Sequence, residues 1–245
     1  MLLEILIPTF NRPEAAIRAI KSILSAADAR VGVRCHSNQP EPLLQQFCDE
    51  NDRVAYNSFP SNRGPHQNTH KVLSEASSTF CMLLSDEDYL EPEQLPKFLD
   101  FLESLRSSCS LVSCAVFDEA ESSYYYHLGD SLHKQYVGAA GFTILSSTTY
   151  MSGYAFKVEA LQQLDLSFFL SKNFTDSDGP PYNAYGHIDI AQRLLTDGIG
   201  AFYMDKLVVK GRPLKHGGHA FSHRDHSVED VEEDNLDLNI KVYGP

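Results

Sequence analysis

The segment 80–92 constrains the fold more than any other part of the sequence. An apolar run at 81–84 leads, after one serine, into three consecutive acids, Asp86, Glu87 and Asp88. This pattern is typical of a buried strand that delivers carboxylates to its C-terminal end. In an open α/β sheet, ligands bind beyond the carboxyl ends of the strands. Adjacent carboxylates repel one another, and a divalent cation or solvent relieves that repulsion. The segment therefore predicts either a cation site or a solvated acidic turn.

The first half of the chain repeats the order strand, loop, helix. Short apolar runs at 2–7 and 31–35 predict strands, and each is followed by apolar residues at helical spacing. This order is typical of βαβ units. We therefore predict an α/β fold, a single Rossmann-type domain with a mostly parallel central sheet flanked by helices. Right-handed crossovers would bring Thr9, Asn38 and Asp86 to one edge of that sheet.

Local signals predict several boundaries. Proline lacks the N–H that a central strand needs, so the first strand is predicted to end near Pro8, Thr9 and Phe10. A helix is predicted to start at Pro13, after Asn11 or Arg12. Glu87 would point away from its neighbours along an extended chain, and so has no predicted role.

Further boundaries are predicted for the later elements. A helix is predicted over 92–105, and two short strands over 201–204 and 207–210.

Composition excludes several classes of protein. The formal net charge of −13 argues against a nucleic acid as partner, since that needs a clustered basic face. The five cysteines form no CxxC pair and are predicted to be reduced core residues. No apolar run is long enough to predict a transmembrane segment or a signal peptide. We expect a cytoplasmic protein, and docking at a membrane surface is left open.

The sequence divides into an ordered part and a C-terminal segment. Residues 1–210 are predicted to form one domain. Residues 211–245 are rich in histidine and then in acids, with six acids between Glu229 and Asp237. This composition is typical of a solvated tail.

The ordered set of motifs resembles the family 2 glycosyltransferases of the GT-A fold, in the nucleotide-diphospho-sugar transferase superfamily. The resemblance covers roughly residues 1–210 and rests on the order and spacing of five segments. It implies a nucleotide-binding half at 1–108 and an acceptor-side half at 109–210. These segments are ILIPTFNRPEAAIRAIKSIL, SNRGPHQNTHKVLSEA, MLLSDEDYLEPEQL, YMSGYAFKVEAL and YGHIDIAQRLL.

The resemblance implies roles for the acids that follow the fourth predicted strand. Asp86 would hold the ribose of a nucleotide, and Asp88 would bind Mg2+ or Mn2+ together with the diphosphate of the substrate. The cation would stabilise negative charge on the departing nucleoside diphosphate.

The resemblance also implies a nucleotide pocket built from several loops. Its residues are Pro8, Thr9 and Asn11 after the first strand, Ser37 or Asn38 after the second, and Asn62, Gly64 and Asn68 before the fourth. Helix capping is the alternative for Asn11, and turn and capping chemistry is the alternative for the last three. An aspartate is usual where Ser37 or Asn38 stands, so the base that is bound stays open.

The resemblance further implies a catalytic base. Asp189, near the start of a late helix, would take a proton from the acceptor hydroxyl and so give inversion by single displacement. Ile188 stands where the family commonly has a second acid. Asp176 and Asp178 in a preceding loop are competitors, and Asp189 could instead stabilise the start of its helix.

Histidines after residue 211 are the last candidate ligands. Some GT-A enzymes complete the metal site with a histidine after the last core strand, which here corresponds to His216 or His219. Imidazole would favour Mn2+ over Mg2+. The alternative is a polar loop with exposed histidines.

The expected partners follow from the resemblance. A UDP-sugar is the first expectation for the donor and a glycan or lipid-linked glycan for the acceptor, and a homodimer is left open. One alternative is a non-catalytic GT-A protein that binds a nucleotide or a glycan. A nucleotidylyltransferase is a second alternative, but residues 9–14 lack the glycines that would cradle a triphosphate.

Overall fold

The computed structural model describes residues 1–124, 135–137, 150–167 and 186–211. The elements of the first half are β1 (Leu3–Thr9), α1 (Pro13–Leu24), β2 (Val31–Ser37), α2 (Pro42–Asp49), β3 (Val54–Ser58), α3 (Pro65–Ser74), β4 (Phe80–Leu83), β5 (Tyr89–Leu90) and α4 (Leu95–Ser104). Those of the second half are β6 (Leu111–Asp118), β7 (Ser123–Tyr124), β8 (Gln135–Val137), the 3-10 turn η1 (Met151–Gly153), β9 (Tyr154–Lys157), α6 (Val158–Leu161), α7 (Gly186–Asp197) and β10 (Ile199–Lys210).

All the described strands belong to one sheet. Its order is β3-β2-β1-β4-β9-β6-β10-β5, with β7 on β6 and β8 on β10. The ladders between β3, β2, β1 and β4 and between β6 and β10 are parallel, whereas the shorter ladders of β5, β7, β8 and β9 are antiparallel. The predicted single α/β domain with a mostly parallel sheet flanked by helices is therefore confirmed.

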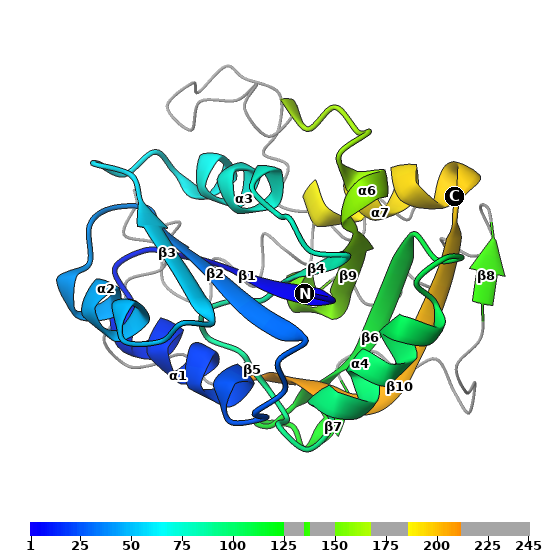
Figure 1. Cartoon of the computed structure of the whole chain (residues 1–245), viewed down its shortest axis with the longest axis horizontal. Coiled ribbons are helices and arrows are strands. Elements are labelled where there is room, and N and C mark those ends of the chain that lie inside the picture. The colour runs from blue at the N-terminus through cyan, green and yellow to red at the C-terminus, as the bar shows by residue number, and fades with distance from the viewer. Residues whose placement is uncertain (125–134, 138–149, 168–185, 212–245) are drawn as a thin grey trace.

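Helices cover both faces of the sheet (Figure 1). One apolar cluster joins α1, α2 and α4 to one face through residues such as Ile5, Ile20 and Phe98. A second cluster joins α3, α6 and α7 to the other face through residues such as Leu6 and Val72. Alternate residues of β1 thus enter different cores, as the two-residue period of a strand requires. The parallel part of the sheet is therefore buried on both faces, as is usual in α/β proteins.

β1 includes Pro8 and ends at Thr9, as predicted. The carbonyl of Leu6 accepts the N–H of Leu84, directly after β4, and the carbonyl of Thr9 accepts the N–H of Asn38, directly after β2. Consecutive residues of a strand direct their N–H and C=O groups to opposite sides. The nitrogen of Pro8 therefore lies on the same side as the carbonyl of Leu6, the side of β4, and β4 ends at Leu83. A missing N–H costs little there, because that side of β1 no longer has a neighbour.

Two other predicted boundaries differ from those of the structure, unlike the end of β1. α4 begins at Leu95 rather than at position 92. β10 is one strand from Ile199 to Lys210, not two. Its register with β6 shifts between Tyr203 and Val208, and pairing with β6 resumes after the polar residues Asp205 and Lys206. Such a bulge interrupts the apolar pattern without ending the strand.

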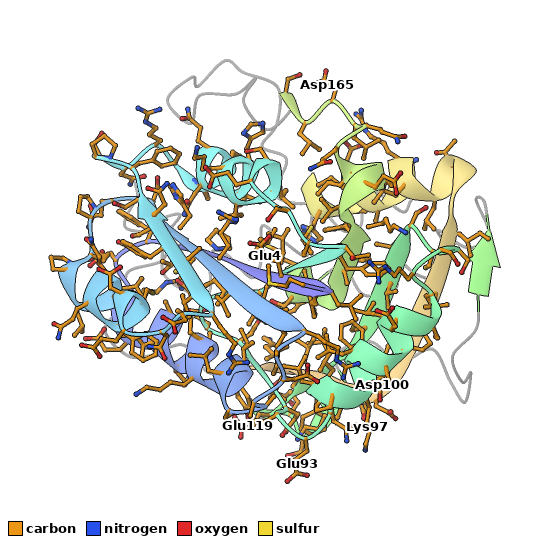
Figure 2. The ribbon with its side chains drawn as sticks, viewed as in Figure 1. Glu4, Glu93, Lys97, Asp100, Glu119 and Asp165 are labelled. Atoms are coloured by element: carbon orange, nitrogen blue, oxygen red, sulfur yellow. The ribbon has the colours of Figure 1, made fainter. Side chains whose placement is uncertain are left out.

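Glu4 lies near the centre of the sheet, unlike the other charged residues labelled in Figure 2. Its side chain is 3% exposed and lies 2.9 Å from Nη2 of Arg34 on β2. Its second oxygen accepts the backbone N–H of Ser77 at 3.0 Å. This ion pair fixes β1 to β2 on the face that α3 covers.

Arg34→Met is expected to lower the free energy of unfolding by about 3 kcal/mol, since it leaves a buried carboxylate without its cation. Urea unfolding of the purified protein measures the loss. In the control, Glu4→Met combined with Arg34→Met is expected to recover most of the stability, because it removes both charges. A single variant as stable as the wild type would contradict this account.

Candidate functional site

The site begins where β1 and β4 diverge. β2 lies on one side of β1 and β4 on the other, so the order in which strands are added to the sheet reverses at β1. Ligands bind beyond such switch points in α/β sheets. Oγ1 of Thr9, at the end of β1, donates to Oδ2 of Asp86 at 2.6 Å. The backbone N–H of Asn38 donates to the carbonyl of Thr9 at 2.9 Å. The structure thus brings together the three residues predicted to share this edge.

Asp86 is a buried acid with one oxygen that accepts no hydrogen bond from the described residues. Its side chain is 1% exposed, and Oδ1 lies 2.9 Å from Nη2 of Arg12 without a well-aligned hydrogen bond. Burial raises the pKa of this carboxyl to about 6, because desolvation disfavours the charged form. A carboxylate oxygen that is buried but not fully bonded is suited to accept a ligand hydroxyl.

The acids lie in a tight turn rather than on an extended chain. The N–H of Asp88 donates to the carbonyl of Ser85 at 3.0 Å, and Asp86 and Glu87 form the turn between them. Glu87 therefore does not point away as predicted. Its Oε1 lies 2.5 Å from Nη1 of Arg12, so Arg12 binds both acids of the turn.

Asp88 joins three segments that are distant in the sequence. Its Oδ1 accepts Oη of Tyr150 at 3.0 Å and the N–H of Gly211 at 3.1 Å. Its Oδ2 accepts Oγ of Ser152 at 2.5 Å. Burial raises the pKa of Asp88 to about 7 despite these donors. The side chain thus fixes the acidic turn to η1 and to the end of β10.

The chemistry of Asp88 is compatible with a divalent cation. A carboxylate offers about four lone-pair positions, and the protein fills three of them, which leaves one on Oδ2. A cation would also stabilise the charged form of this buried acid. Among residues 1–124, 135–137, 150–167 and 186–211, no three His, Cys, Asp or Glu side chains converge as a ligand set. Substrate phosphates and water would have to complete the shell, as is usual for Mg2+.

The loop before α3 is built from asparagine side chains. Nδ2 of Asn38 donates to Oδ1 of Asn62 at 2.6 Å, and Oδ1 of Asn38 accepts the N–H of Arg63 at 2.9 Å. Oδ1 of Asn62 also accepts the N–H of Gly64 at 2.8 Å. Gly64 has a φ of 85°, which residues with a side chain rarely adopt. The turn chemistry proposed for this loop is confirmed, and its contact with a ligand stays a prediction.

Asn68 supports the end of β1 from α3. Its Nδ2 donates to the carbonyl of Thr9 at 3.0 Å, so its Oδ1 faces Nδ1 of His36 at 2.6 Å. Because the amide oxygen of Asn68 can only accept a hydrogen bond, Nδ1 of His36 carries the proton. Burial lowers the pKa of His36 below its usual value, because the site disfavours the imidazolium.

This lowered pKa of His36 gives a pH dependence. Folded His36 binds a proton less tightly than unfolded His36, so its contribution to stability is lost as the pH falls below about 6.5. We expect the free energy of unfolding of the wild type, minus that of His36→Gln, to decrease as the pH falls from about 7.5 to about 5.5. Urea unfolding at several pH values measures this difference. A difference that stays constant or grows on acidification would contradict the burial of a neutral imidazole.

Asn11 does not cap α1. The N-cap residue is Arg12, without a side-chain cap bond, and Asn11 is exposed with a φ of 56°. Asparagine tolerates this left-handed conformation better than most residues. The capping alternative for Asn11 is therefore wrong, and its contact with the nucleotide, like that of the half-buried Pro8, stays a prediction.

Asp189 lies in the first turn of α7, where the helix dipole favours a carboxylate. Nε of Arg193, one turn later, donates to its Oδ2 at 3.0 Å, and the side chain is 31% exposed. Within the described residues, the polar partner found for Asp189 is Arg193, which does not belong to the acidic turn. The predicted role of Asp189 as a base stays a prediction.

Four other candidates lie outside the described residues. They are the competing acids Asp176 and Asp178 and the histidines His216 and His219.

The structure adds residues that the sequence did not single out: Arg12, Tyr150, Ser152 and Gly211. Arg12 precedes a proline, which indicated only a helix start. Tyr150 and Ser152 stand in one of the segments that carry the family resemblance, and that segment was the available signal.

The sheet order and the acids at its switch point define an α/β protein of the GT-A class. The model of glycosyl transferase family 2 matches residues 4–164, and the chain belongs to that family. The predicted family is thereby confirmed.

Solved structures with the same fold include S. aureus TarS. Residues 1–349 of TarS in complex with UDP-GlcNAc match with a TM-score of 0.69 and 12% identity, over 95% of this chain and 64% of that one. The same TarS fragment without a named ligand matches with a TM-score of 0.65 and 12% identity, over 86% of this chain and 60% of that one. Its complex with UDP matches with a TM-score of 0.63 and 10% identity, over 86% of this chain and 61% of that one.

The chain spans less than two thirds of these TarS structures. No curated protein matches the sequence. In the part of the chain that the structure describes, no helix is long and apolar enough to cross a membrane.

Proposed function

We propose that this chain is an inverting, metal-dependent glycosyltransferase that moves a sugar from a nucleoside diphosphate donor to a glycan or lipid-linked glycan. The observation that carries the proposal is the Thr9–Asp86 pair at the switch point of a family 2 sheet. A UDP-sugar is the first donor to test, because the TarS structures with the same fold were solved with UDP-GlcNAc and with UDP.

Each part of the site has a role in this proposal. Asp86 accepts a ribose hydroxyl through the oxygen that Thr9 leaves open. The loops that carry Pro8, Thr9 and Asn11, and Asn38, Asn62, Gly64 and Asn68, enclose the nucleotide. The apolar sheet beneath them excludes water, which strengthens polar contacts to the donor.

Mn2+ or Mg2+ would be held by Asp88 and the donor diphosphate, with His216 or His219 as a further ligand. The metal supplies positive charge that stabilises the departing nucleoside diphosphate. Asp189 takes the proton from the acceptor hydroxyl as that oxygen attacks the anomeric carbon.

Release of UDP from UDP-sugars in the presence of Mn2+ tests the proposal, with candidate glycans as acceptors. We expect turnover with at least one donor and a loss of about 10²- to 10⁴-fold in Asp189→Asn, the range for removal of a general base. The exposed acid Glu159 provides the control Glu159→Gln, which keeps its activity. Nucleotide binding without turnover of any donor would favour the non-catalytic alternative instead.

A further inference from the structure

Arg12 lies between two carboxylates of the acidic turn. Nη2 is 2.9 Å from Oδ1 of Asp86, and Nη1 is 2.5 Å from Oε1 of Glu87. The side chain of Arg12 is only 14% exposed although it stands at a helix start. A planar guanidinium that contacts two acids at once holds both in a defined direction, which a single ammonium does not do.

The backbone before Arg12 directs this side chain toward the turn. Asn11 has a φ of 56°, and the chain reverses there between β1 and α1. α1 then begins at Pro13, whose fixed φ suits the first helical position. The position of Arg12 is therefore set by a left-handed residue on one side and a rigid helix start on the other.

The two oxygens of Asp86 are held by one loop. Thr9 donates to Oδ2 and Arg12 contacts Oδ1, and both residues come from the connection between β1 and α1. Without Arg12, a single hydrogen bond would remain, and the carboxylate could rotate about it. A ligand hydroxyl would then meet an acceptor without a fixed direction.

We propose that Arg12 is a positioning residue of the donor site: it orients the Asp86 carboxylate toward the ribose hydroxyls and so makes the site select a ribonucleotide over a deoxyribonucleotide. The inference rests on the proposed function. It adds a residue that acts through Asp86 and makes the ribose contact of Asp86 the basis of nucleotide selection.

Calorimetric titration with UDP and with deoxy-UDP tests the inference. Wild type is expected to bind UDP about 10- to 100-fold more tightly, the worth of one hydrogen bond to a charged group. Arg12→Met is expected to bind UDP about 10- to 100-fold more weakly, as is usual when the partner of a ligating side chain is removed. Its affinities for the two nucleotides should become nearly equal, because the loss falls on the ribose contact.

Arg18→Met is the matched control. Arg18 lies on α1, the helix that Arg12 precedes. Within the described residues its hydrogen bond to the same turn goes to the carbonyl of Glu87, at 2.5 Å. Whatever its effect on affinity, the preference for UDP over deoxy-UDP should persist. Arg12→Lys keeps the charge and is expected to retain part of the preference, and it replaces Arg12→Met if that variant does not fold.

Two results would overturn the inference once wild type is seen to bind UDP. One is an unexpected nucleotide preference: a wild type that binds UDP and deoxy-UDP equally well, or an Arg12→Met variant that keeps the full preference for UDP. The other is unchanged UDP affinity in Arg12→Met. If wild type bound none of UDP, GDP and CDP, the proposed function itself would fail.

Discussion

Replacing Asp88 with asparagine is expected to reduce the UDP affinity measured with Mn2+ to the value measured with EDTA. We expect a loss of about 3 kcal/mol, or more than a hundredfold, because a bound cation would lose its carboxylate partner. The amide retains an oxygen for Tyr150 and for the N–H of Gly211, so the fold is largely preserved. Asp88→Ala would remove the acceptor of three donors at once, and is expected to lose stability as well as the cation.

The control for this prediction is Asp100→Asn, which makes the same charge change at an exposed position of α4 (Figure 2). Calorimetric titration of both variants with UDP, with Mn2+ and then with EDTA, separates the metal-dependent part of the affinity. If Mn2+ raised the UDP affinity of Asp88→Asn as much as that of the wild type, the cation would be held by other residues.

Gly211→Ala is expected to lower the free energy of unfolding by about 1–3 kcal/mol, the usual cost of forcing an extra group into a packed site. A Cβ at position 211 would lie 1.9 Å from the carbonyl oxygen of Glu87, which is a backbone atom that no rotamer change can move. The clash would separate the end of β10 from the acidic turn and weaken the bond from Gly211 to Asp88. Thermal unfolding should show a decrease of about 2–12 °C in Tm.

Gly32→Ala is the control for this substitution. A Cβ at position 32 would meet Sδ of Met1 at 2.4 Å, but that side chain is flexible and 59% exposed, so it can move. A small change for Gly32→Ala and a large one for Gly211→Ala is the expected pattern. Equal changes would mean that the end of β10 is not packed against the turn.

The sequence predicted the parts of the fold that depend on local pattern. The alternation of apolar runs and helical spacing gave the first strands and helices, and the right-handed crossover placed Thr9 and Asp86 at the same edge. Their hydrogen bond at 2.6 Å confirms that placement. The turn chemistry at Asn62 and Gly64 was likewise local.

What the sequence did not predict depends on contacts between distant residues. The donors to Asp88 stand 62, 64 and 123 positions away, at spacings that no periodicity indicates. The direction of Arg12 depends on the left-handed backbone of Asn11, which asparagine tolerates but does not require. The continuity of β10 past Asp205 depends on a bulge, and two polar residues in a row gave the pattern of a strand end.

The most direct test of the account is the affinity of the wild-type protein for UDP, GDP, CDP and dTDP by calorimetric titration, with Mn2+ and then with EDTA. The account predicts that one ribonucleotide, UDP first, binds with a Kd near the micromolar range, which corresponds to about −8 kcal/mol. EDTA should weaken that binding. No binding of any of the four nucleotides in the presence of Mn2+ would contradict the assignment of the acidic turn as a donor site.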